Sequence, residues 1–179
     1  SGTVRTAADV IASASNVQGW LLAQHPVGCA SLDDEVAYQG KYSIRLRNSE
    51  GRPGGAWIVS RQIDSPSTGR LAVSVMLRGE PSEKPDTAEP ILVRVAIEGT
   101  VAGTAMRQSQ TFAVKRDGKW SQTPCRVEVD QMPRCGVESL RLAIDVMNEG
   151  TVWIDDVRAE DSFMKQTEKS QLQSQMFLA

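Results

Sequence analysis

The sequence predicts an all-β protein, an antiparallel sandwich or barrel, with a helix only at the C-terminal end. Apolar and polar residues alternate along most of the chain, as they do in strands that bury one face. Turn residues separate these runs at short intervals, and the period becomes helical after residue 160. The 179 residues, 40% of them hydrophobic, suit one domain with an appendage and can fill a core.

About eight or nine short runs indicate strands, and the pattern is clearest where every second residue is apolar. The main strand candidates are Ser43–Arg47, Trp57–Ile63, Leu71–Leu77, Ile91–Ile97, Gln110–Val114, Lys119–Val129, Leu140–Val146 and Thr151–Ala159. Asp117-Gly118 predicts a hairpin between two of them. The segment Gly79–Pro90 contains three prolines and predicts a surface loop, either a rim loop over a binding face or a tolerated insertion.

The two ends of the chain differ from the middle. Phe163, Met164, Leu172, Met176 and Phe177 fit one face of an amphipathic helix. We therefore expect an N-terminal arm at 1–16, a sandwich at 17–160 and a C-terminal helical extension at 161–179. A chain that opens Ser1-Gly2 and ends inside the expected helix is expected to be part of a longer protein, and the helix could bind a protein partner.

The composition excludes several classes of function. The net charge of -2 gives no basic excess for nucleic acid, and no apolar run is long enough for membrane insertion. His25 is the single histidine, so histidine zinc sites and HExxH proteases are excluded. Asp155 and Asp156 are adjacent, and strand neighbours face opposite sides, so we do not expect them to flank one bond. The sequence therefore predicts a protein that is not an enzyme.

Three cysteines, Cys29, Cys125 and Cys135, leave two interpretations open. Cys125 and Cys135 flank a strand and a turn at Met132-Pro133, and could form a disulfide there. Alternatively, all three are buried thiols that act as small apolar side chains.

Four segments carry a resemblance to a known family. Thr151-Val-Trp-Ile-Asp-Asp-Val157 resembles the closing strand of jelly-roll carbohydrate-binding modules of the galactose-binding-like superfamily. Ala37–Leu46, with its Gly-Lys-Tyr-Ser run, resembles an early strand of these modules, and Gly69–Arg78 resembles their next core strand. Gly19-Trp20 stands where they often carry Gly-Trp. The resemblance spans about Val17 to Ala159 and implies a jelly-roll β-sandwich.

The resemblance also implies a function and a location. It implies a non-catalytic module of a larger extracytoplasmic protein, secreted or on the cell surface, that binds a glycan or polysaccharide. The alternative is a structural or protein-interaction β-sandwich without a sugar site, because the central strands display few aromatic residues and the C-terminal helix offers a contact.

A structural calcium is the one cofactor that the resemblance implies. Calcium takes six to eight oxygen ligands, and the matching positions are the Asp155 carboxylate and the carbonyls of Gly40 and Lys41. The family's Asn-X-X-Phe-Glu start is replaced here by Ala14–Gln18, which removes one carboxylate. Alternatively, Asp155 accepts hydrogen bonds from the loop backbone and holds the two ends of the domain together.

Aromatic rings and outward polar groups are the candidate sugar-binding residues. Trp57, Trp120 and Tyr38 are candidates for stacking on a sugar ring, with packing in the fold as the alternative for each. Arg94, Arg141 and Asp145 are expected to point outward from central strands. If these strands share a face, it suits an anionic sugar or a polypeptide better than cellulose.

Overall fold

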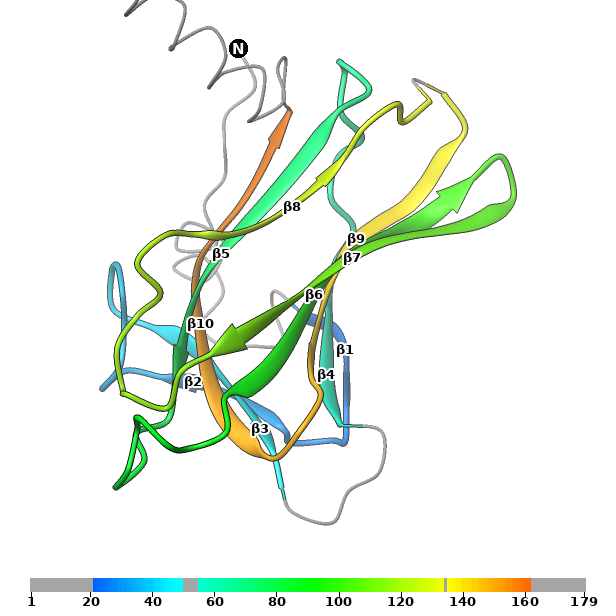
Figure 1. Ribbon diagram of the computed structural model, residues 1–179. Helices are drawn as coiled ribbons and strands as arrows, with labels where there is room; N and C mark the ends of the chain where they lie inside the picture. Colours follow the sequence, from blue (N-terminus) through cyan, green and yellow to red (C-terminus); the bar gives the residue numbers. More distant parts are fainter. Residues whose placement is uncertain (1–20, 50–54, 134, 162–179) are drawn as a thin grey trace, which may run out of the picture.

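The computed structural model describes residues 21–49, 55–133 and 135–161, and all regular elements in this part of the chain are strands (Figure 1). The all-β prediction is therefore confirmed for the described residues. The predicted arm at 1–16 lies outside them, and so does the predicted helix, except that Asp161 is the last residue of a strand. The strands are β1 (Leu21–His25), β2 (Ala30–Asp33), β3 (Ser43–Asn48), β4 (Ala56–Ser60), β5 (Leu71–Gly79), β6 (Ile91–Val101), β7 (Thr104–Val114), β8 (Cys125–Val129), β9 (Val137–Val146) and β10 (Gly150–Asp161).

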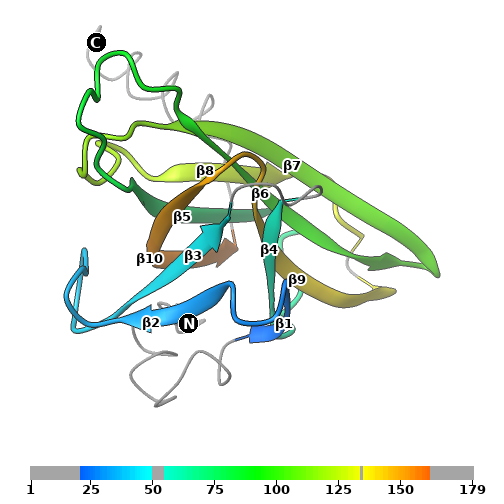
Figure 2. The ribbon, with the colours of Figure 1, turned by 90° about the horizontal axis from the view of Figure 1, so that it is seen from below.

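The ten strands form two five-stranded sheets, and every pairing between neighbours is antiparallel. Sheet A has the order β1-β4-β9-β6-β7, and sheet B has the order β2-β3-β10-β5-β8 (Figures 1 and 2). Most connections cross from one sheet to the other, and only β2–β3 and β6–β7 join chain neighbours that pair. The chain is thus a sandwich of two layers rather than a barrel.

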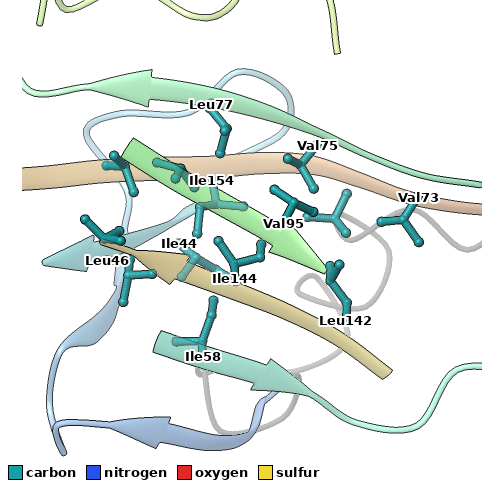
Figure 3. Close-up of a cluster of buried hydrophobic side chains, with 14 of the residues drawn as sticks. Ile44, Leu46, Ile58, Val73, Val75, Leu77, Val95, Leu142, Ile144 and Ile154 are labelled. Carbon is teal, nitrogen blue, oxygen red and sulfur yellow. The ribbon is translucent and has the colours of Figure 1, made fainter. Parts of the chain in front are cut away.

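The core lies between the sheets and follows from the alternation in the sequence. Ile44, Leu77 and Ile154 of sheet B meet Ile58 and Ile144 of sheet A, and all five side chains are fully buried (Figure 3). Alternate residues of the same strands therefore point outward, away from the core. Each sheet consequently presents one outer face, and the two outer faces point in opposite directions.

Several details differ from the sequence prediction. The alternation does not mark β1 and β2, which have five and four residues and a bulge near Leu21. The prediction of a hairpin at Asp117-Gly118 is wrong, because β7 pairs with β6 and β8 pairs with β5. The real hairpin joins β6 to β7 at Ala102 and Gly103. Trp120 forms only an isolated bridge with Arg78, so the strand expected from Lys119 begins at Cys125.

A β-bulge in β10 overturns the expected placement of Asp155 and Asp156 on opposite sides. Asp155 pairs with Met76 and Arg158 pairs with Ser74, so β10 has one extra residue here. Asp156 has a positive φ of 47°, the backbone change that a bulge introduces. Both carboxylates consequently lie on the outer side of sheet B, where each accepts hydrogen bonds from the surrounding chain.

None of the three cysteines forms a disulfide in this structure, so the bridge between Cys125 and Cys135 is not formed. Cys29 is buried, as the alternative interpretation requires, whereas Cys135 is exposed. Burial raises the pKa of the Cys125 thiol above its ordinary value, which lowers its reactivity as a thiolate. No helix in the described part of the chain is long and apolar enough to cross a membrane.

The end of β10 is held by a cluster around Asp161. Its carboxylate accepts hydrogen bonds from the backbone N–H of Ser67 at 2.7 Å, from that of Thr68 at 3.2 Å and from both hydroxyl groups. Desolvation alone would raise the pKa of Asp161, but these hydrogen bonds outweigh it and lower the pKa to about 2. The cluster ties the last strand to the connection that precedes β5.

This depressed pKa predicts a specific loss of stability in acid. The folded pKa lies below the ordinary value of 3.8, so the contribution of Asp161 is present above pH of about 4 and is lost as the pH falls toward 2. Because the side chain is exposed, we expect it to contribute about 1 kcal/mol or less. Thermal unfolding of Asp161→Asn should show a lower Tm than the parent at pH 7 and the same Tm near pH 2. Asp64→Asn, another exposed carboxylate, is the control, and an unchanged pH profile in Asp161→Asn would contradict the assignment.

Candidate functional site

The outer face of sheet A brings together most of the polar candidates from the sequence. His25, Trp57, Asp145, Arg94 and Thr111 lie side by side in one row that crosses all five strands. We call this face, with the two rows described next, the sheet A face. The sequence left open whether Arg94, Arg141 and Asp145 share a face, and they do in the structure, because β9 and β6 are neighbours in register.

Two further rows follow along the strands. The middle row consists of small or apolar side chains, Ala23, Val59, Ala143, Ala96 and Ser109. Ala96 and Ala143 are buried even though they point away from the core, and they form a small outer cluster with Val59 and Trp57. The third row contains Arg141, Glu98 and Arg107. Charged rows therefore lie on both sides of a small-residue row.

Ion pairs connect the first and third rows. Asp145 accepts hydrogen bonds from Arg94 Nε at 2.6 Å and from Arg107 Nη2 at 3.0 Å. Glu98 accepts them from Arg107 Nη1 at 3.1 Å and from Arg141 Nε at 2.9 Å. Arg107 thus spans the middle row and bridges the two carboxylates.

The solvent reaches the two kinds of charged group unequally. The arginine side chains are 38–43% exposed, whereas the carboxylate side chains of Asp145 and Glu98 are only 14% and 16% exposed. The three arginines also exceed the two carboxylates by one charge. The sheet A face consequently presents guanidinium N–H donors to an approaching molecule.

Trp57 supplies the aromatic surface of the sheet A face. The indole is half-buried and packs against Val59, Ala96 and Ala143. The His25 ring stacks beside it, with centroids 5.7 Å apart and planes inclined by 28°. The start of β4 is fixed at Gly55, whose φ is 73° and where a Cβ would come within 2.5 Å of the Val146 carbonyl oxygen. Only glycine allows the backbone before β4 to come this close to the end of β9. This contact helps to place Trp57 beside Asp145.

The structure places Tyr38 and Trp120 elsewhere, on the outer side of sheet B. Their rings contact each other edge to face, with centroids 5.6 Å apart. They belong to the connections 34–42 and 115–124, and Trp120 bridges to Arg78 of β5. The aromatic residues proposed from the sequence therefore divide between two opposite faces and do not form one site.

Asp155 does not offer calcium the arrangement that the resemblance implies. Its carboxylate is fully buried and accepts hydrogen bonds from the backbone N–H groups of Tyr38 at 2.7 Å, Gln39 at 3.1 Å and Asp156 at 2.6 Å. Calcium requires oxygen ligands, and here N–H donors occupy the carboxylate. The described residues also contain no group of three His, Cys, Asp or Glu side chains that could hold a metal ion. Calcium at Asp155, Gly40 and Lys41 stays a prediction that this donor set does not fit.

Among the charged and aromatic-ring residues of the sheet A face, sequence reasoning did not identify His25, Glu98 and Arg107 as site residues. Glu98 could have been found, because it continues the alternation of Arg94 and Ala96 on β6. Arg107 lies in the first half of β7, where Thr104–Ser109 contains few β-branched residues and gave no strand signal. His25 depends on the pairing of β1 with β4, which the local sequence does not indicate.

Comparison with solved structures supports the fold. No protein-family model and no curated protein sequence matches this chain. Among solved structures, a family 16 carbohydrate-binding module is similar with a TM-score of 0.55 and 14% identity, over 83% of this chain and 94% of that one. The CBM22-2 xylan-binding domain of Paenibacillus barcinonensis Xyn10C is similar with a TM-score of 0.56 and 11% identity, over 82% of this chain and 94% of that one.

A third similar structure is TmCBM61 in complex with β-1,4-galactotriose. Its TM-score is 0.51 and its identity 14%, over 80% of this chain and 88% of that chain. At such identities the likeness concerns the fold alone, and this chain has a β-sandwich similar to those of these carbohydrate-binding modules.

Proposed function

We propose that the domain is a non-catalytic module that binds an acidic glycan on the sheet A face, within a larger extracytoplasmic protein. The observation that carries this proposal is the row in which Trp57 lies next to Asp145 and Arg94, with exposed guanidinium groups above covered carboxylates. The shared fold with carbohydrate-binding modules supports the general class of function.

The aromatic side chain supports recognition of the sugar ring. A pyranose has an apolar face of C–H groups, which packs against indole through dispersion and the hydrophobic effect. The half-buried indole of Trp57 packs beside Ala143 and Ala96, which are themselves covered, so a sugar ring would contact the exposed part of the indole.

The arginines support a preference for acidic sugars. Guanidinium binds carboxylate through two parallel N–H···O bonds, which are stronger than bonds between neutral groups. Arg94, Arg107 and Arg141 already share two carboxylates, so a uronate would add a third anion to a face with an excess positive charge. Neutral sugars would gain only the hydrogen bonds to their hydroxyl groups.

Calorimetric titration with hexagalacturonate and with xylohexaose tests this proposal. We expect the acidic hexamer to bind more tightly, with an affinity that falls as salt rises from about 0.05 M to about 0.5 M. Arg107→Gln should weaken hexagalacturonate binding about tenfold, the loss of one charge-assisted contact. Arg47→Gln removes the same charge from the exposed outer side of β3 and should leave binding unchanged. Equal affinity for both hexamers, or an Arg107→Gln variant that binds like the parent, would contradict the preference for acidic glycans.

One observation favours the alternative of a protein-interaction domain. β7 is an eleven-residue strand at the edge of sheet A, and it pairs with β6 without a bulge. Long regular edge strands can add a strand from another chain. If no glycan binds in the titrations, recognition of a polypeptide along this edge becomes the leading function.

A further inference from the structure

A hollow lies on the opposite side of the sandwich from the sheet A face. Its volume is about 630 Å³, within the usual range for small-molecule sites. Its floor is formed by Ser74 and Met76, which point outward from β5 between the core residues Val73, Val75 and Leu77. We call it the sheet B hollow.

An aromatic ring lines one wall of the sheet B hollow. Tyr38 is 44% exposed and also has a neighbouring aromatic ring. The edge-to-face contact with Trp120 restrains the ring from the side of the 115–124 connection. Thr123 and Pro124 of the same connection line the hollow as well. The ring is therefore held in place while part of it stays open to solvent.

The loop that carries Tyr38 is fixed by buried and partly buried carboxylates. Asp155 accepts the N–H groups of Tyr38 and Gln39, and the bulge places Asp156 on the same side. Asp33, at the start of the loop, accepts the indole N–H of Trp153 at 2.8 Å and the N–H of Val36 at 2.9 Å. Desolvation would raise the pKa of Asp33, but these bonds outweigh it and lower the pKa. The wall of the hollow is thus formed before any ligand arrives.

The charges that line the sheet B hollow are balanced. Arg158 Nε donates to Asp156 at 2.8 Å, and Arg126 Nη1 lies 3.3 Å from Glu160. Each pair offers both N–H donors and carboxylate acceptors. A neutral hydroxylated molecule can use both, whereas an anion would meet two carboxylates and a cation two arginines.

We propose that the sheet B hollow is a second ligand site, distinct from the sheet A face, that binds a neutral sugar of one or two rings. Tyr38 would pack against the apolar face of a pyranose, and the paired charges would exchange hydrogen bonds with its hydroxyl groups. A ligand of this size is expected to bind in the millimolar range.

Chemical-shift mapping of the full 179-residue chain with xylobiose and with lactose tests this site. We expect saturable shifts at Tyr38, Ser74 and Thr123. Tyr38→Ala should weaken this binding about tenfold or more, since it removes the ring but keeps the backbone N–H that Asp155 accepts. Tyr38→Phe should restore most of the affinity. Gln122→Ala, an exposed residue of the neighbouring connection, is the control.

The outcomes separate this site from the sheet A face. Disaccharide binding that is retained in Trp57→Ala and lost in Tyr38→Ala supports the second site, whether or not hexagalacturonate binds to the sheet A face. Absence of saturable shifts in the hollow with both disaccharides would overturn it. So would disaccharide binding that Trp57→Ala abolishes and Tyr38→Ala leaves intact, because the sugar would then occupy the sheet A face.

Discussion

Replacing Trp57 by alanine is expected to weaken binding of an acidic glycan to the sheet A face by about thirtyfold, the loss of about 2 kcal/mol that an aromatic contact at the centre of a site typically provides. On one side of the ring in its row lie the charged groups of Asp145 and Arg94, and on the other side lies the smaller, polar ring of His25, so no neighbour offers an equal apolar surface. Isothermal titration with hexagalacturonate measures the effect.

Two further variants show whether the loss arises from the ring itself. Trp57→Phe keeps an aromatic surface and should lose much less affinity. Trp120→Ala removes an indole from the opposite side of the sandwich and should bind hexagalacturonate like the parent. Thermal unfolding must show that Trp57→Ala is folded, since the indole also packs on Val59, Ala96 and Ala143. A folded Trp57→Ala protein with unchanged affinity would contradict a role for this ring.

Replacing Asp155 by alanine is expected to cost about 3 kcal/mol of unfolding free energy and to lower the Tm by roughly 10 °C. The carboxylate is fully buried and satisfies the N–H groups of Tyr38, Gln39 and Asp156. Alanine would leave these donors without their partner, and the loop between β2 and β3 would lose the hydrogen bonds that Asp155 of β10 makes with Tyr38 and Gln39. Thermal and urea unfolding measure the change.

Controls distinguish this structural role from one that depends on metal. Asp34→Ala removes an exposed carboxylate from the same loop and should change stability by less than about 0.5 kcal/mol. A chelator should leave the Tm of the parent unchanged, because N–H donors occupy the Asp155 oxygens. A Tm that falls with chelator and recovers with calcium would instead support the calcium implied by the resemblance. An Asp155→Ala protein as stable as the parent would contradict the role of the hydrogen bonds.

The fold was largely predictable from the sequence because burial imposes the period of the strands. Ile91–Ile97 and Leu140–Val146 alternate so regularly that their outward residues, Arg94, Arg141 and Asp145, could be assigned before the sheet order was known. β1 and β2 were not marked because such short strands offer too few residues for a period. Their place depends on pairing with β4 and β3, which is a tertiary effect.

The site was less predictable, because it depends on which strands become neighbours. Asp117-Gly118 has the composition of a hairpin turn, yet the chain crosses there from sheet A to sheet B. This crossing separates Trp120 from Trp57 and places it beside Tyr38. The bulge at Asp156 likewise has no local signal, since it arises from the pairing of β10 with β5. Local pattern therefore identified which residues point outward but not which of them meet.

Chemical-shift mapping with hexagalacturonate tests the central claim most directly, namely that the sheet A face is the glycan site. The structure predicts saturable shifts in the indole N–H of Trp57 and in the backbone amides of Ala96, Ala143 and Asp145, on three strands adjacent in sheet A. Shifts confined to Tyr38, Ser74 and their neighbours on sheet B would contradict the claim, as would the absence of any saturable shift at millimolar hexagalacturonate.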